Sequence, residues 1–438
     1  MTEIAAADYG MYSLLAGILF VALAALFLRQ LSTVFDLFSL NLIYIAFGSS
    51  GLIAFYTGTG RETILDELLL LCVWLIVTKL GMSIRPVNSP KHTAPVQIST
   101  RTNRDIAAAV VVTAVSLAYI FPILSSGLLS GADGSIDNRF LIADESKIQA
   151  YLFGAVGMLP PAIIFRMFGR ISLGKVFLML VPFWLVQIAT LSKTGALFPI
   201  FAISIYFSLL FNYRLRKPPS LVKQVSILAG MGLFVYVAFA IITSTLTRLE
   251  ISPLNFLLAR LYSSFDGLYL LAQINWDPQG SLSLIQWYFS PFLKVANAFT
   301  NEYNASNFVV AVQYFGYSPS YSGNLPNNNH IGELLLTQSG VMRPLMASFT
   351  GLTYGFFYIQ SVWYLRTGGR LLLPAAFMAC TPLGFLIDGQ GWFSAFLVSI
   401  MLCIPTELLA RVISAVRARP ATKPRRIAGR RTEPIANH

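Results

Sequence analysis

The sequence predicts an all-α, polytopic integral membrane protein with about eleven transmembrane helices. Of its 438 residues, 55% are hydrophobic and only 11% are charged, whereas soluble domains carry about 25% charged residues. Apolar runs of about 18 residues or more recur along the chain, and such a run is long enough to cross a bilayer as a helix. Lys and Arg gather in the short segments between these runs, as they do in the cytoplasmic loops of membrane proteins.

The predicted spans follow one another within a single transmembrane domain, residues 1–416. The first span comes after an acidic start, MTEIAAADYG, and not after the basic segment that opens a cleavable signal peptide, so we expect it to be retained. The eleven spans are 11–28, 34–56, 64–82, 106–123, 149–165, 176–192, 194–211, 225–245, 344–363, 371–387 and 391–410.

The distribution of basic residues predicts the orientation of these spans. With the carboxyl terminus in the cytoplasm, 23 of the 31 Lys and Arg residues face inward and 8 face outward, so the amino terminus is predicted to lie outside. The same distribution argues against a nucleic-acid partner, because no basic groove is formed. The basic tail, 417–438, is rich in Pro, Arg and Ala and is predicted to be disordered and held near anionic membrane lipid.

Two segments on the predicted outer side are longer than ordinary connections, 124–148 and 246–343. Loops as long as the second one are usually functional or contain structure of their own. Within it, 252–274 and 281–299 are rich in aromatic residues and Leu but interrupted by charge, which predicts helices lying at the membrane interface. A pair of tilted spans is the alternative for these two segments.

Eight basic residues are predicted to lie on the outer side, against the general charge bias: Arg61, Arg139, Lys147, Lys193, Arg248, Arg260, Lys294 and Arg343. Four of them are singled out as candidate site residues: Arg139, Lys193, Arg248 and Arg260. Lys193 stands between two apolar runs with almost no loop around it, where a cation is costly unless an anion or water compensates. Guanidinium groups bind phosphate oxygens in bidentate fashion, and Lys adds a point charge. These residues are therefore candidates for a lipid-linked phosphate or pyrophosphate, with snorkelling or pairing to nearby carboxylates as the alternative.

The segment NNNHIGELLLTQSG, residues 327–340, places the only outer-face histidine just before a predicted span. The neutral imidazole of His330 can accept a proton from a hydroxyl near pH 7. Glu333 follows at i+3, and a helix beginning near Asn329 would place both side chains on one face. The asparagines also predict a helix N-cap, and the two interpretations are compatible.

Metal and thiol chemistry have little support in the sequence. The three cysteines lie in apolar runs without a C-x-x-C pair, which predicts small packed side chains. One outer histidine without a Cys or His partner argues against zinc, whereas a carboxylate site for Mg²⁺ or Mn²⁺ at Asp133 and Asp137 stays open. P-loop, dinucleotide-binding, H-E-x-x-H and G-x-S-x-G motifs are all missing from the sequence.

These features together resemble the bacterial O-antigen polymerase and O-antigen ligase superfamily of GT-C membrane glycosyltransferases. The resemblance depends on the eleven spans with one large outer loop, on LSKTGALFPIFAIS, which is similar to a short external basic turn of that family, and on NNNHIGELLLTQSGVMRPLMASFTGLTYGFFY, which is similar to its loop-closing histidine motif. The wording H-I-G-E-L resembles the polymerase branch more closely than the ligase branch.

The resemblance implies a protein of the bacterial inner membrane whose active site faces the periplasm. The donor would be a glycan on undecaprenyl pyrophosphate, and the acceptor the non-reducing end of another lipid-linked repeat unit. No cofactor and no metal are implied, and a chain-length regulator protein is a further expected partner. His330 with Glu333 would engage the acceptor hydroxyl, while Arg139, Lys193, Arg248 and Arg260 would contact the pyrophosphate. Trp276, Trp287, Tyr288 and Tyr321 offer aromatic faces for sugar rings.

Two alternatives remain open from the sequence. A ligase would perform the same chemistry with lipid A–core as the acceptor. A flippase or exporter of lipid-linked oligosaccharide would share the apolar content and the outer cations, although transporters often show internal repeats and midplane charges that this sequence lacks.

Overall fold

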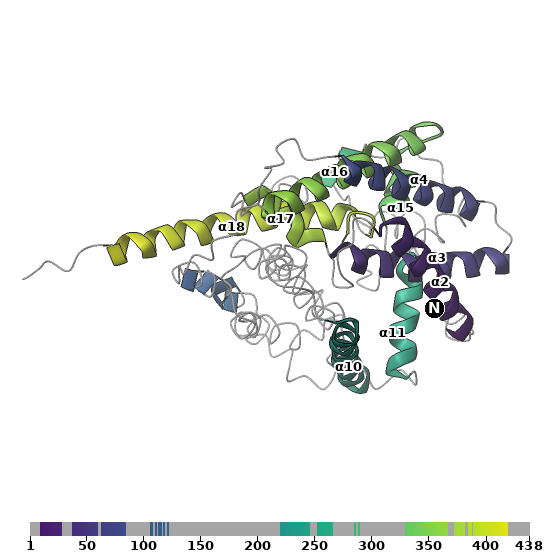
Figure 1. Cartoon of the computed structure of the whole chain (residues 1–438), viewed down its shortest axis with the longest axis horizontal. Helices are drawn as coiled ribbons and strands as arrows, with labels where there is room; N and C mark the ends of the chain where they lie inside the picture. The colour runs from purple at the N-terminus through teal and green to yellow at the C-terminus, as the bar shows by residue number, and fades with distance from the viewer. Residues whose placement is uncertain are drawn as a thin grey trace, which may run out of the picture.

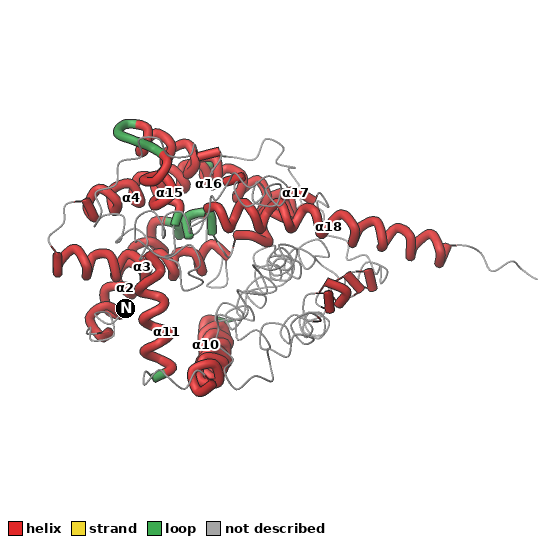
Figure 2. Tube along the Cα trace, turned by 180° about the vertical axis from the view of Figure 1, so that it is seen from behind, coloured by secondary structure: helices red, strands yellow, loops and turns green. Residues whose placement is uncertain are grey.

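The computed structural model describes residues 9–28, 37–59, 63–84, 220–245, 252–265, 329–366, 372–381, 384–387 and 389–418, together with scattered residues at 106–121 and 284–289. Within these ranges every regular element is a helix and no strand occurs (Figures 1 and 2). The all-α prediction is confirmed for this part of the chain.

Six of the predicted spans coincide with long helices. The apolar composition that predicted each span also favours helix, because Leu, Ala and Met are strong helix formers. These helices are α2 (Tyr9–Leu26), α3 (Leu37–Thr59), α4 (Thr63–Ser83), α10 (Leu221–Thr245), α16 (Met342–Arg366) and α18 (Gly389–Ala418).

Two of the described helices are long and apolar enough to cross a membrane, as judged by length and composition. One window is Leu37–Ala54 in α3, with a mean hydropathy of 1.7, and the other is Gly389–Arg417 in α18, with 1.9. A shorter apolar helix covers Gly10–Leu26. The predicted spans 149–165, 176–192 and 194–211 lie outside the described residues, and 106–123 is described only in part.

The predicted span 371–387 is wrong as a continuous helix. Helix α17 runs only from Leu372 to Cys380, and the chain then turns at Gly384, whose φ is 61°. The residue after Thr381 is a proline, which has no backbone N–H to continue the helix. The carbonyl of Thr381 accepts from the Gly384 N–H at 2.9 Å, which closes the turn, and from the Asn41 side chain at 2.7 Å. The apolar run is therefore a short helix followed by a buried turn.

Part of the predicted interfacial segment 252–274 is helical. Helix α11 covers Pro253–Tyr262 and a single 3₁₀ turn, η2, covers Ser263–Phe265. Both elements pack against α3, and the Tyr262 hydroxyl lies 2.7 Å from the Ser13 hydroxyl of α2. Of the segment 281–299, only Leu284, Ile285, Tyr288 and Phe289 are described, and they have helical backbone.

Helices α4 and α16 pack closely against each other. Three glycines make this close approach possible. A Cβ at Gly81 would overlap the backbone of α16, and a Cβ at Gly351 or Gly355 would overlap the backbone of α4. Small residues at a helix–helix contact let backbones approach closely, which is a common packing mode for apolar helices.

The short helix α15 (His330–Thr337) is enclosed by this scaffold and contacts α4, α16 and α18. All its residues from His330 to Leu336 are buried. In contrast, the carboxyl-terminal half of α18 extends beyond the other described helices (Figure 2), and large apolar side chains along it, such as Met401, Leu408 and Val416, are exposed. The scaffold thus combines an apolar exterior with one buried polar helix start.

A buried histidine and glutamate as the candidate functional site

Helix α15 begins where the sequence predicted a cap. Asn329 is the N-cap: its side-chain Oδ1 accepts from the Gly332 N–H at 2.9 Å, and its backbone carbonyl accepts from the Glu333 N–H at 3.0 Å. The predicted cap is confirmed, and so is the shared face of His330 and Glu333, whose side chains meet. The cap opens a separate eight-residue helix, and α16 starts only at Met342.

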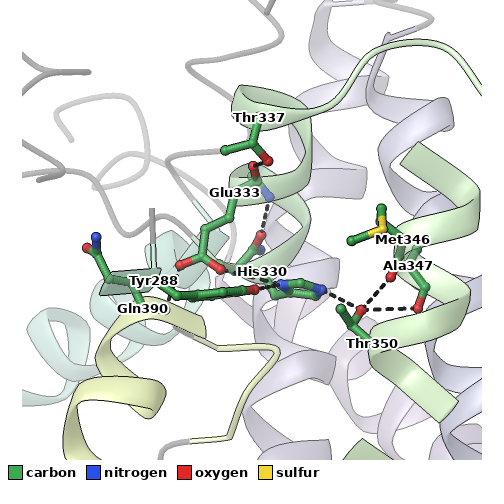
Figure 3. Close-up of polar contacts among 10 residues, drawn as sticks. Tyr288, His330, Glu333, Thr337, Met346, Ala347, Thr350 and Gln390 are labelled. Atoms are coloured by element: carbon green, nitrogen blue, oxygen red, sulfur yellow. Dashed lines mark hydrogen bonds and ion pairs between the residues drawn. The ribbon is translucent and has the colours of Figure 1, made fainter. Parts of the chain in front are cut away.

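Both ring nitrogens of His330 contact protein hydroxyls. Nε2 lies 2.7 Å from Oγ1 of Thr350 in α16, and Nδ1 lies 2.7 Å from the hydroxyl of Tyr288 (Figure 3). The imidazole is completely buried, with 0% exposure. A buried polar ring of this kind is stable only when its nitrogens are hydrogen-bonded, so these two hydroxyls fix its position.

The hydrogen bonds of Thr350 favour one tautomer of His330. The Thr350 hydroxyl is 2.7 Å from the carbonyl of Met346 and 3.2 Å from that of Ala347, so its hydrogen is donated to its own helix (Figure 3). With that hydrogen donated to the helix, the Thr350 oxygen accepts from Nε2–H of His330, and this is the tautomer that we assign to the neutral ring. Nδ1 is therefore unprotonated in the neutral ring and accepts from the Tyr288 hydroxyl.

The carboxylate of Glu333 connects two helix starts. Glu333 lies in the first turn of α15, and its Oε1 accepts from the backbone N–H of Gln390, at 2.7 Å, in the first turn of α18. A negative charge is stabilised at a helix N-terminus, and here two such termini converge on one side chain. Its other oxygen, Oε2, is 3.4 Å from Nδ1 of His330, close enough to stabilise a charged imidazolium at that position.

Gly389 leaves room for this carboxylate. A Cβ at Gly389 would overlap Oε2 of Glu333 and would approach Cε1 of Tyr288 to 3.1 Å. The glycine in the sequence DGQG is thus required by the packing of Glu333 and Tyr288 against the start of α18.

Aromatic side chains surround the imidazole on its remaining sides. The ring of Phe385 lies 4.3 Å from that of His330, and the rings of Trp74 and Tyr288 are each 6.3 Å from it, as measured between centroids. Phe385 comes from the turn after α17, whose Leu386 carbonyl accepts from the His330 N–H at 3.0 Å. The turn after α17 therefore contributes both an aromatic contact to the His330 ring and a backbone hydrogen bond to its N–H.

Burial lowers the pKa of His330 from 6.5 to about 3, because a charged imidazolium is poorly solvated in this enclosed site. At neutral pH the ring is uncharged and its Nδ1 lone pair is available. The lowered pKa makes the imidazolium costly, and the carboxyl of Glu333, 3.4 Å from Nδ1, is placed to offset part of that cost during a transient proton transfer.

The structure brings together three of the residues that the sequence singled out: His330, Glu333 and Tyr288. Arg260 lies in α11, and nothing is described of its side chain. The remaining predicted residues lie outside the described part of the chain; they are Arg139, Lys193, Arg248, Trp276, Trp287 and Tyr321. Arg343, which is predicted to lie on the outer side, donates to the carbonyls of Gln338, at 2.9 Å, and Leu335, at 3.5 Å, and so caps the end of α15.

Sequence reasoning missed Thr350, Phe385 and Gly389, and Tyr288 was selected only as a sugar-stacking candidate. Thr350 belongs to α16 and His330 to α15, so no local spacing in the sequence indicates their contact. Gly389 could have been noticed as part of a glycine pair directly before a long apolar run, since such glycines often mark close approach.

No group of three or more His, Cys, Asp and Glu side chains that could hold a metal ion occurs within the described ranges. Asp133 and Asp137, the candidates for a carboxylate metal site, lie outside those ranges. The chain matches no protein-family model, no curated protein and no solved structure.

Proposed function

We propose that this protein is a membrane glycosyltransferase that polymerises lipid-linked glycan repeat units, as an O-antigen polymerase does. In this reaction a hydroxyl of one undecaprenyl-pyrophosphate-linked repeat unit attacks the anomeric carbon of a glycan on a second undecaprenyl pyrophosphate, which leaves. The enzyme must activate or orient the attacking hydroxyl and stabilise the departing pyrophosphate.

The observation that carries the proposal is the buried contact among His330, Glu333 and Tyr288. A neutral imidazole, an adjacent carboxylate and a phenol hydroxyl form a hydrogen-bonded group of the kind used for general base catalysis. The group lies in the segment whose sequence resembles the family's loop-closing histidine motif. The cap of α15 is made by Asn329 and does not use the imidazole, so capping alone does not account for the buried histidine.

The apolar exterior favours a lipid-embedded enzyme over a soluble one. In the apolar window of α18 only 19% of the residues are buried, whereas in that of α3 67% are buried. Exposing so much hydrocarbon to water is unfavourable, and a bilayer removes this cost. We propose a multi-pass protein of the bacterial inner membrane with the histidine cluster at the periplasmic side, where lipid-linked glycans are assembled.

Glycan ladders from cells test the proposal. In a strain whose O-chain synthesis depends on this chain, His330→Ala should reduce the ladder to single-repeat lipopolysaccharide, because only unpolymerised repeat units are then left for a separate ligase to attach to lipid A–core. Immunoblots of the membrane fraction must show that the variant is present at the wild-type level. The matched control is His92→Ala, in a predicted cytoplasmic loop, which should give a normal ladder.

Each of the other outcomes has a clear meaning. Full-length polymer accumulating on undecaprenyl pyrophosphate would identify a ligase instead. Repeat units trapped on the cytoplasmic side would identify a flippase. A ladder of normal length from His330→Ala would remove His330 from the mechanism.

A further inference from the structure

We infer that Tyr288 is a catalytic residue of this site: its hydroxyl, and not the imidazole of His330, meets the acceptor hydroxyl and relays its proton to Nδ1. The inference rests on the proposed glycan transfer and adds a residue and a proton path to it. The inference depends on which groups surround the imidazole. His330 is 0% exposed, so the acceptor hydroxyl cannot reach its ring directly.

Access to the imidazole is closed from both nitrogens. Thr350 occupies Nε2 and Tyr288 occupies Nδ1, both at 2.7 Å, while Phe385 and Trp74 cover the ring. Of the two hydroxyl-bearing neighbours, Thr350 donates its hydrogen to the backbone of α16. Tyr288, in contrast, donates to Nδ1 in the assigned tautomer, and its side chain is only half-buried. A phenol oxygen can accept a hydrogen bond while donating one, so Tyr288 can bridge an acceptor to the histidine.

The distances around Nδ1 suit a proton that arrives during the reaction. Nδ1 of His330 and Oε2 of Glu333 are 3.4 Å apart, so in the tautomer assigned above Nδ1 is free of a hydrogen on the side that faces the carboxyl group. Once Nδ1 is protonated, Oε2 becomes an ion-pair partner on the same side as Tyr288. The Gln390 N–H holds that carboxylate in place through Oε1, so the cation is stabilised without a large rearrangement.

The step balances as follows. The acceptor oxygen forms a bond to the anomeric carbon, its proton moves to the Tyr288 oxygen, and the phenol proton moves to Nδ1 of His330. The bond between the anomeric carbon and the pyrophosphate oxygen breaks, and its electron pair leaves with undecaprenyl pyrophosphate. After product release the imidazolium returns its proton through Tyr288 to water.

Thr350 is a positioning residue in this scheme. By accepting from Nε2–H it keeps the Nδ1 lone pair directed at Tyr288. Thr350→Val should leave Nε2–H without a partner and allow the other tautomer, whereas Thr350→Ser should restore the wild-type state. Thr353 provides a matched control, because its hydroxyl makes the same bond to its own helix, to Phe349 O at 2.8 Å.

The first measurement does not depend on activity. Solid-state ¹⁵N NMR of histidine-labelled protein in lipid, with His330→Gln to assign the signal, should show His330 as the neutral Nε2–H tautomer. Tyr288→Phe should shift the Nδ1 resonance, and Thr350→Val should change the tautomer while Thr353→Val does not. An Nδ1–H tautomer in the wild-type protein would overturn the relay whether or not the protein polymerises glycans.

The second measurement uses single-turnover transfer in proteoliposomes with isolated lipid-linked repeat units. Tyr288→Phe should slow the chemical step by about 10²-fold or more, the usual contribution of an acid–base group, with KM nearly unchanged. Tyr364→Phe, in the last turn of α16, should have no effect. Rates in H₂O–D₂O mixtures should curve with deuterium fraction for the wild type, because two protons move, and should lose that curvature in Tyr288→Phe.

The outcomes separate the relay from the proposed function. A wild-type protein that polymerises, together with a Tyr288→Phe variant of equal rate, would overturn the relay alone. A linear dependence on deuterium for the wild type would do the same even if the variant were slow. Failure of the wild type to transfer glycan would overturn the proposed function, while the NMR tautomer would still decide on the hydrogen-bonded order of the site.

Discussion

Replacing His330 with Gln should change the pH dependence of stability in a direction that the burial of the ring dictates. The pKa of His330 is lowered from 6.5 to about 3 in the folded protein, so between these values the unfolded chain binds a proton that the folded chain does not. The contribution of the neutral ring is fully present above pH 6.5 and is lost progressively as the pH falls. At 1.4 kcal/mol per pH unit, the loss between pH 6.5 and pH 5 is about 2 kcal/mol.

The assay is unfolding of the purified chain in mixed micelles with increasing SDS, at several pH values from 5 to 8. The wild-type free energy of unfolding should fall by about 2 kcal/mol more than that of His330→Gln over this range. Titration of all other groups cancels in the difference between the two proteins. His92→Gln, from a predicted cytoplasmic loop, should keep the wild-type slope. Parallel curves for wild type and His330→Gln would refute the buried, neutral state of this histidine.

Three further substitutions test the packing and charge of the site. Gly389→Ala should destabilise the protein by about 1–3 kcal/mol in the same assay, because the new methyl group overlaps Glu333. The control is Gly230→Ala, whose methyl group meets open space and which should be neutral or stabilising. Equal effects of the two substitutions would contradict the close packing of Gly389 against Glu333. Asn329→Ala should lower the free energy of unfolding by about 1 kcal/mol, and Asn329→Asp should not, since aspartate keeps an acceptor for the Gly332 N–H. An Asn329→Ala variant as stable as the wild type would show that the cap does not contribute to stability. Glu333→Gln should fold normally but lose at least about 10-fold in transfer rate, because an amide cannot stabilise an imidazolium; full activity would show that the charge is not used.

The sequence was most informative about the long elements. Apolar runs such as 34–56 and 391–410 predicted helices that the structure contains, because composition alone favours helix over so many residues. The same reasoning was wrong at 371–387. The average composition of this segment is apolar, but the helix ends at Cys380, just before Pro382 and Gly384. Hydropathy averages over a window, whereas a helix break depends on one or two backbone groups.

The centre of the site could be predicted, but its surroundings could not. Asn329 precedes the helix as its cap, and the i, i+3 spacing of His330 and Glu333 places their side chains on a common face. Thr350 and Phe385, in contrast, reach the imidazole from elements 20 and 55 residues away in sequence, through contacts that only the folded arrangement of α15, α16 and α17 creates. The sequence identified Tyr288 by its aromatic ring, whereas the structure adds the hydrogen bond of its hydroxyl.

The most direct test of glycan polymerisation by this protein is reconstitution with its proposed substrate alone. Proteoliposomes would be given lipid-linked repeat units from a strain that lacks this chain, without nucleotide sugar or added metal. The masses of the products would then be measured by mass spectrometry. We predict growth by whole repeat units with release of one undecaprenyl pyrophosphate per unit added, and no growth with His330→Ala. Unchanged single-repeat lipids in the presence of well-folded wild-type protein would contradict the proposed function.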